Sequence, residues 1–465
     1  MADTWLSPRL ERRQLEAERR PSTTTPQRLR RLSVAIAVLA VALTLVGAGA
    51  LAAAAVTALG IQQRTVPAIV GMQRIHFWLS DADRSAANAY LSGGAEVTLP
   101  ELQYQSDIAA ASRELQTASA HDPGGGNTSE RLQTIATLID QYQGLVQTAN
   151  VDDRLGVPIG TVYLQAGTTL MHRPGTGILA QVDALRGLYA NDLDRANLTL
   201  QVAQWMLPLY VVVALVLAGL LVYTQAFVRR RFHRRRNPRL LLATLLLVVA
   251  VTTSGLGAGQ ARQSIRSAED QKYARLLNLW NAHALLSDVN GDESLWLIAR
   301  DQQGRDRADQ AFQAATRRLV DRPLNDEIMQ AASHGDVRFN GMLADELRAA
   351  DVGPERTAAL RVLTLYRTFM DVDAAVRGKV AQGAEVDAIT QALGTDKGQL
   401  TFAFQDVDWY LGLAIQHLQG DFDSEMTYTE RVLVGTALVE LLALAIAALT
   451  FWGLRPRFEE FRAGR

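Results

Sequence analysis

Four long apolar stretches interrupt this 465-residue chain, and they constrain its fold more than any other feature. A helix needs about 20 apolar residues to cross a bilayer whose hydrocarbon core is about 30 Å thick. The sequence therefore predicts four transmembrane helices, at residues 34–60, 206–228, 240–257 and 432–454. The first is longer than the apolar core of a signal peptide and follows a hydrophilic tail, residues 1–33, so we interpret it as a signal anchor.

Arginine placement predicts the orientation of these helices, because cytoplasmic loops are enriched in basic residues. Arginines flank the predicted spans in the N-terminal tail, in a loop at residues 229–239 and in a C-terminal tail at residues 455–465. We therefore expect a multi-pass protein of the cell membrane with both termini in the cytoplasm. Residues 61–205 and 258–431 then form two extracytoplasmic domains.

Composition adds to this prediction. By count, residues 61–205 hold 14 acidic and 9 basic side chains, and residues 259–430 hold 27 and 18, so both outer domains are acidic. The chain has no cysteine, which excludes disulfides, thiol nucleophiles and thiolate metal sites. We expect no nucleic-acid partner.

A short internal repeat suggests that the two outer domains are duplicates. His76, Leu79, Ser80 and Asp81 recur at a constant offset of 207 residues as His283, Leu286, Ser287 and Asp288. Around each copy, mostly apolar residues recur on one seam in alternating steps of three and four, which is typical of a helix in a bundle or coiled coil. The sequence predicts that each outer domain begins with such a helix.

Turn signals divide the outer domains into helices, and no segment shows the two-residue alternation of a strand. In the first domain we expect a helix that ends at Ser92, a second that is capped by Thr98 and Glu101, and breaks at residues 122–126 and 174–175. In the second domain we expect breaks at Gly304, Pro323 and residues 334–335, 353–354 and 394. The fold class is therefore all-α, with two tandem domains that resemble four-helix bundles, internally duplicated.

Polar residues on the repeated helix are candidates for a site. His76 with Asp83, and His283 with Asn290, occupy seam positions of the predicted helix. Buried polar groups at such positions often specify helix register and partner. Alternatively, these side chains line a small-ligand or pH-responsive site.

Two further features concern the predicted membrane region. Glu440 lies inside the fourth span, where burying an acid is costly, so we interpret it as a residue that couples movement of the membrane helices. Its expected partners are Thr252, Thr253 and Ser254 on the third span. The alternative is a hydrogen bond to a neighbouring helix with a purely structural role. The loop after the second span is a candidate docking site for anionic lipid or an acidic effector, and its alternative role is to set topology alone. Its candidate docking residues are Arg229, Arg230, Arg231, Arg234, Arg235 and Arg236.

Motifs of common enzymes are absent from the sequence. There is no phosphate-binding loop, zinc-protease helix, nucleophile elbow or dinucleotide fingerprint. The seven histidines show no metal-ligand spacing. We therefore predict a protein that is not an enzyme, with no catalytic residues, no metal and no cofactor. The predicted cytoplasmic segments are too short for a kinase, so any output passes through another protein or through helix movement within the membrane.

Two resemblances follow from these features. The segment from Leu79 to Leu91, in a helix that leaves the first span, resembles the first helix of chemoreceptor four-helix-bundle sensor domains. The whole plan resembles the actinobacterial GlnX-type membrane proteins, and the excess of arginine over lysine agrees with such a source. That second resemblance implies a relay from an extracytoplasmic solute-binding lipoprotein to the soluble Ser/Thr protein kinase G.

From these patterns and resemblances we expect a transmembrane sensor that couples extracytoplasmic glutamate or aspartate to a cytoplasmic Ser/Thr kinase or other effector. The expected outer partner is a solute-binding lipoprotein, and a homo-oligomer is compatible with the sequence. One alternative is a chemoreceptor-like protein that binds a small ligand directly. The other is a scaffolding subunit of a cell-envelope complex.

Overall fold

A computed structural model describes residues 25–60, 64–93, 98–122, 126–155, 159–203, 206–232, 238–267 and 273–421, with a few positions between 424 and 452. The described residues are predominantly helical and contain no strand. The all-α fold predicted from the turn signals is therefore confirmed.

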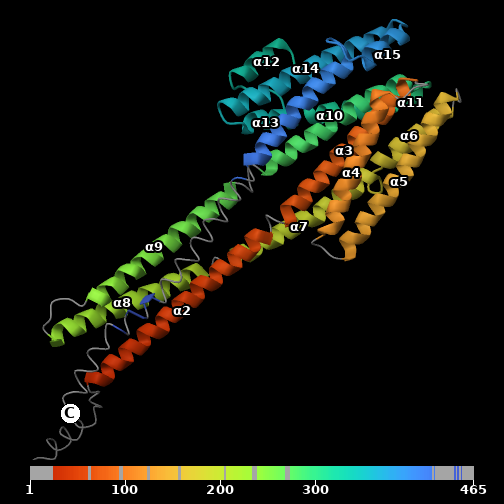
Figure 1. Ribbon diagram of the computed structural model, residues 1–465. Coiled ribbons are helices and arrows are strands. Elements are labelled where there is room, and N and C mark those ends of the chain that lie inside the picture. The colour runs from red at the N-terminus through yellow and green to blue at the C-terminus, as the bar shows by residue number, and fades with distance from the viewer. Residues whose placement is uncertain are drawn as a thin grey trace, which may run out of the picture. The chain divides into compact units, whose positions relative to one another are not determined.

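The chain divides into two compact units (Figure 1). The first, which we name the apolar unit, comprises residues 1–56, 199–261 and 430–465. The second, the polar unit, comprises residues 57–198 and 262–429, which we name its N-terminal and C-terminal halves. Both predicted outer domains thus contribute to one compact unit.

The apolar unit is built from α2 (Thr25–Gly60), α8 (Met206–Phe232) and α9 (Pro238–Ser267). Small and aliphatic side chains from all three helices, together with Ile446, form a shared core. The opposite faces of these helices are also aliphatic and exposed, as Val38 and Leu215 show. A helix that is apolar on all sides suits a membrane span or a large core.

Two described helices are long and apolar enough to cross a membrane, at Arg30–Gly49 and Pro208–Phe227. A shorter apolar helix covers Leu241–Thr253, inside the third predicted span. Most of the fourth predicted span lies outside the described residues. Two apolar helices support membrane association weakly by themselves, and the four-span topology stays a prediction.

The N-terminal half contains α3 (Val66–Leu91), α4 (Leu99–Ala120), α5 (Gly126–Arg154), α6 (Gly160–His172) and α7 (Ile178–Ala203). The predicted turns lie between these helices. Thr98 caps α4 as expected, because its hydroxyl accepts a hydrogen bond from the Glu101 backbone N–H at 3.4 Å. Glu101 does not complete the capping box in the usual way, since its carboxylate pairs with Arg154 at 2.7 Å.

The C-terminal half contains α10 (Ala274–Ile298), α11 (Gln302–Leu319), α12 (Asp326–Ser333), α13 (Met342–Ala349), α14 (Pro354–Ala381), α15 (Glu385–Leu393) and a helix at residues 400–421. The predicted break at Gly304 is wrong. Gly304 lies in the first turn of α11, where its N–H donates to the N-cap residue Asp301. The chain breaks three residues earlier.

The first helices of the two halves, α3 and α10, pack side by side at the centre of the polar unit (Figure 1). Within this contact Gly291 of α10 faces Arg84 of α3, and a Cβ at residue 291 would lie 3.3 Å from the Arg84 Cα atom. Glycine therefore permits the backbones to approach. Helices α4, α5 and α6 pack on or beside α3, whereas α11 and α13 pack on α10.

Candidate functional site

Each half of the polar unit contains a histidine that pairs with an aspartate between its first and last helices. In the N-terminal half, Nδ1 of His76 on α3 lies 3.1 Å from Oδ1 of Asp183 on α7. In the C-terminal half, Nε2 of His283 on α10 lies 2.6 Å from Oδ1 of Asp408, in the helix at residues 400–421. An ionised carboxylate only accepts hydrogen bonds, so the imidazole N–H donates in both pairs.

The surroundings of the two pairs differ. Asp183 is partly exposed and also pairs with Arg186 at 3.3 Å. Burial acts to raise the pKa of Asp183, but the hydrogen bond from His76 and the charges of His76 and Arg186 hold that pKa below its ordinary value. His283 is buried, and its ring stacks on Phe77 of α3 with centroids 4.0 Å apart. The C-terminal pair is therefore connected to the neighbouring half through Phe77.

Polar side chains also join α3 to α10 directly. The Ser287 hydroxyl donates to Asp81 Oδ1 at 3.1 Å, and the Asn88 amide donates to Asn290 Oδ1 at 3.2 Å. The Ser294 hydroxyl donates to Asn88 Oδ1. All of these side chains are buried, so these hydrogen bonds restrict how α3 and α10 can be aligned.

The structure gives the predicted seam residues separate partners. Asp83 does not contact His76. Instead it accepts hydrogen bonds from Tyr142 at 2.9 Å and Thr168 at 3.2 Å, and it lies 3.2 Å from Nε2 of His172. Asn290 lies against Asn88 rather than His283. The repeated positions thus serve different contacts in the two halves.

A buried charge cluster between α3 and α4 was missed by the sequence analysis. Arg84 donates to Asp81 at 2.6 Å, and its guanidinium lies 4.4 Å from the ring centroid of Phe404. Asp107, on α4, accepts from Gln103 at 2.8 Å and from Ser85 at 3.4 Å. Burial and then the charge of Asp81 raise the pKa of Asp107 to about 9. Burial opposes the ionisation of Asp81 too, but Arg84 lowers its pKa, so Asp81 carries the charge and Asp107 the proton at neutral pH.

A second missed residue is His172, at the end of α6. The side chain of His172 is 36% exposed, and desolvation by its neighbours lowers its pKa, but the hydrogen bond to Asp83 and the charges of Asp288, Asp83 and Asp292 together raise that pKa to about 9. Burial and the charge of Asp288 raise the pKa of Asp292 to about 8. Because Asp288 and Asp292 belong to α10, this protonated histidine connects the two halves.

Loss of the His172 proton is expected to destabilise the polar unit. The folded-state pKa of about 9 lies above the ordinary value, so the contribution is fully present below about pH 6.5 and is lost as pH rises through 9. We expect His172→Gln to lower the thermal midpoint of the full-length protein at pH 6.5 and to match wild type more closely at about pH 9.5. Part of the pH dependence should persist in the variant because Asp292 also titrates. His121→Gln, which removes an exposed histidine, is the matched control; equal pH profiles for wild type and His172→Gln would contradict the assignment.

A third cluster surrounds Arg377 on α14. Its guanidinium lies 2.5 Å from Glu293, 2.6 Å from Asp309 and 3.3 Å from Asp373. The rings of Phe312 and Trp296 pack against it, with centroids at 4.1 and 5.0 Å. Glu293 is fully buried, and burial followed by the charge of Asp373 raises its pKa to about 8. Arg377 therefore holds α10, α11 and α14 together.

The candidates in the apolar unit are described only in part. Arg229 and Arg230 are exposed at the end of α8, and Arg231 lies in the same helix. Arg234, Arg235, Arg236 and Glu440 lie outside the described residues. The hydroxyls of Thr252 and Thr253, expected partners of Glu440, donate to carbonyls of their own helix at 2.8 and 2.6 Å.

No group of three or more histidine, aspartate or glutamate side chains within the described part of the chain is arranged to hold a metal ion. The carboxylates of these clusters instead bind protons or pair with histidine and arginine side chains. Their common chemistry is the alignment of neighbouring helices by charge-assisted hydrogen bonds.

Comparison with known protein families gives one match. Residues 57–197 match the family of actinobacterial sensor domains. The matched segment coincides with the N-terminal half of the polar unit. No curated protein and no solved structure matches the chain. The match supports an actinobacterial sensor protein and suggests a signal-sensing role.

Proposed function

We propose that this protein is a non-enzymatic transmembrane sensor in which the polar unit receives a signal outside the cell and four membrane spans transmit it. The observation that carries this proposal is the His–Asp pair in each half of the polar unit. Each pair joins the helix that follows one predicted span to the helix that leads into the next. A stimulus that shifts one of these helices against the other would therefore act directly on the chain entering the membrane.

The proposed duplication gives this arrangement a simple physical meaning. The first helix of each half, α3 or α10, follows a predicted span. These two helices contact each other. Two sensor bundles that could otherwise associate as separate subunits would then be fused in one chain. The buried contacts of Asn88, Ser287 and Gly291 would fix their alignment.

We propose that glutamate or aspartate availability is the stimulus, sensed through a solute-binding lipoprotein, and that a cytoplasmic Ser/Thr kinase is the effector. The arginine-rich loop at residues 229–239 would contact that effector. This part of the proposal rests on the resemblance to GlnX-type proteins. Direct binding of a small ligand at the histidines is the alternative. It is less favoured because Asp408 and Phe77 already cover His283.

The test is affinity purification of the detergent-solubilised full-length protein from its native host, with and without added glutamate and aspartate, followed by mass spectrometry. We expect a solute-binding lipoprotein whose recovery changes several-fold with the amino acids. The double variant His76→Ala/His283→Ala should reduce the response in phosphorylation of the kinase substrates, whereas His121→Ala should preserve it. Recovery of cell-wall or division proteins alone, without any dependence on amino acids, would favour the scaffold alternative instead.

A further inference from the structure

Exposed apolar side chains are concentrated at one end of the N-terminal half. In the described part of the polar unit, ten large apolar side chains are exposed, and six of them come from three helix termini. We name these six the distal patch: Leu99 and Leu102 in the first turn of α4, Val151 and Leu155 at the end of α5, and Ile159 and Val162 at the start of α6. Leu99 and Leu155 are the most exposed, at 75% and 72%.

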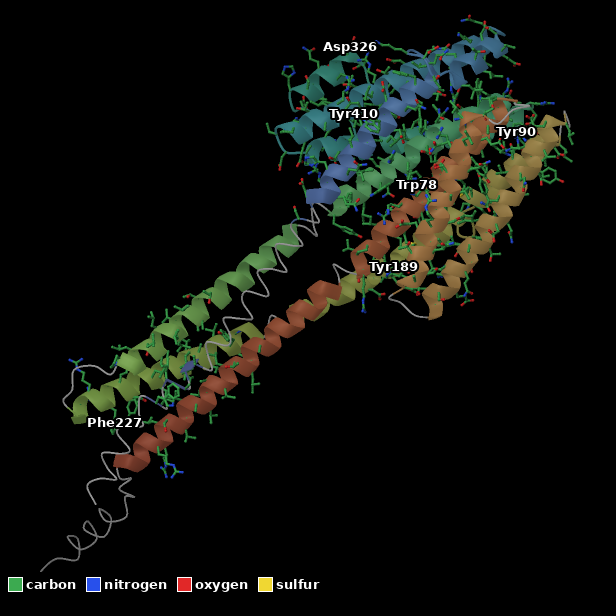
Figure 2. The ribbon with its side chains drawn as sticks, viewed as in Figure 1. Trp78, Tyr90, Tyr189, Phe227, Asp326 and Tyr410 are labelled. Atoms are coloured by element: carbon green, nitrogen blue, oxygen red, sulfur yellow. The ribbon has the colours of Figure 1, made fainter. Side chains whose placement is uncertain are left out.

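Contacts within the polar unit bring these three termini together. Arg154 on α5 pairs with Glu101 on α4 at 2.7 Å, so the start of α4 lies beside the end of α5. At the start of α6, a Cβ on Gly160 would lie 2.8 Å from the Ala149 carbonyl of α5 and 3.0 Å from the Tyr90 hydroxyl. Tyr90 marks this end of α3 in Figure 2. The six side chains therefore share one end of the unit, and they are not scattered single residues, which are common on surfaces.

Lipid is not a suitable occupant of this patch. The chain enters α3 from the first predicted span at Val66, whereas Tyr90 lies at the opposite end of this 26-residue helix. At 1.5 Å per residue, α3 is about 39 Å long. The patch therefore lies at the end of α3 that is far along the chain from the predicted span, and the neighbouring carboxylates of Asp152 and Asp153 do not suit an anionic lipid surface, so we assign the patch a protein occupant.

Charge disfavours a second copy of this chain as that protein. Glu101 and Arg154 neutralise each other, and the carboxylates of Asp152 and Asp153 near Tyr90 outnumber the guanidinium of Arg300. A symmetric contact would place the same acidic rim of both copies together, because a two-fold interface uses the same surface on each subunit.

The size of the patch suits the centre of a heterologous interface. Six side chains that are each about half to three-quarters exposed present on the order of several hundred Å², compared with about 800 Å² per partner in a standard complex. We propose that the distal patch is the docking surface for a separate extracytoplasmic protein, which presents an apolar face with basic side chains at its rim. This inference rests on the proposed function, because it assigns the place where a protein partner delivers the stimulus.

The experiment uses the full-length protein in its host membrane. A photo-reactive amino acid is placed at Leu155, at Val162 or, as a matched control, at Val352, which is 93% exposed and lies outside the patch. We expect one discrete cross-linked partner from the two patch positions and none from Val352. That partner, once purified, should bind the solubilised wild-type chain at least tenfold more tightly than Leu155→Asp, and binding should weaken with added salt. Val352→Asp should leave the affinity within about twofold.

Each result separates this inference from the proposed function. Adducts that join two differently tagged copies of this chain, or adducts to lipid alone, would overturn the docking assignment. Equal cross-linking from Val352 and from the patch would overturn it as well. If the partner binds at the patch but substitution of both His76 and His283 leaves the cellular response unchanged, the docking surface stands and the proposed relay fails.

Discussion

Replacing Arg84 by methionine is expected to lower the thermal midpoint of the full-length protein by on the order of 10 °C. Arg84 is buried and donates to Asp81 at 2.6 Å, so its removal leaves a carboxylate without its counter-charge next to the carboxyl of Asp107. Breaking a buried ion pair by removing one partner typically costs about 3–5 kcal/mol. A loss of 1 kcal/mol shifts the midpoint of a domain of 150–250 residues by about 2–4 °C.

The Arg84 prediction is measured by circular dichroism of the protein in detergent, with two comparison variants. The double variant Arg84→Met/Asp81→Leu should recover most of the loss, because both charges are then removed together. Arg361→Met, which removes an exposed arginine that lies over Tyr410, should cost less than about 1 kcal/mol. If the double variant is as unstable as Arg84→Met, packing of the long side chain would explain the loss rather than the ion pair.

Local signals in the sequence predicted much of the N-terminal half. Ser92 and Gly93 end α3 directly after Leu91, and Thr98 caps α4, because turn and cap residues act within a few positions of the chain. Short helices were harder to predict. Helices α12, α13 and α15 have 8, 8 and 9 residues, which is about two turns and too few for a helical period to emerge.

Only those residues of the candidate site that lie within the short internal repeat could be predicted from the sequence. The offset of 207 residues identified His76 and His283 as equivalent, and the structure pairs both with an aspartate. Those aspartates, Asp183 and Asp408, are not separated by the same offset, because the C-terminal half has additional helices between α11 and its last helix. The sequence alone therefore gave no reason to select them.

The charge clusters could not be predicted because their members lie far apart in the chain. Arg377 is 84 residues from Glu293, and His172 contacts Asp83 across 89 residues. Acidic and basic residues are common on exposed helix faces, so neither residue type marks a buried contact by itself. Only the packing of α14 on its neighbours, and of α6 near α3, distinguishes Arg377 and His172 from charged residues on exposed helix faces.

Replacing Arg377 by methionine is expected to destabilise the protein more at pH 8 than at pH 5. Arg377 is the cation that faces Glu293, Asp309 and Asp373, and Glu293 is fully buried. Burial and mutual repulsion already raise the pKa of Glu293 to about 8, and burial raises that of Asp373 to about 6. Arg377 lowers both pKa values. Without it, the folded state binds more protons than the unfolded state over a wider range of pH. Its stability therefore falls as pH rises.

The expected loss for Arg377→Met is about 3–5 kcal/mol at pH 8 and roughly half of that at pH 5, where protonation removes the repulsion. Thermal midpoints of the full-length protein at both values measure the difference. Arg377→Met/Glu293→Gln should show a smaller loss at pH 8 and a flatter pH profile, because the most buried carboxylate is then neutral. A loss that is the same at pH 5 and pH 8 would show that Arg377 acts through its contacts with Phe312 and Trp296. In that case the guanidinium would stabilise α14 by packing, and its charge would contribute little.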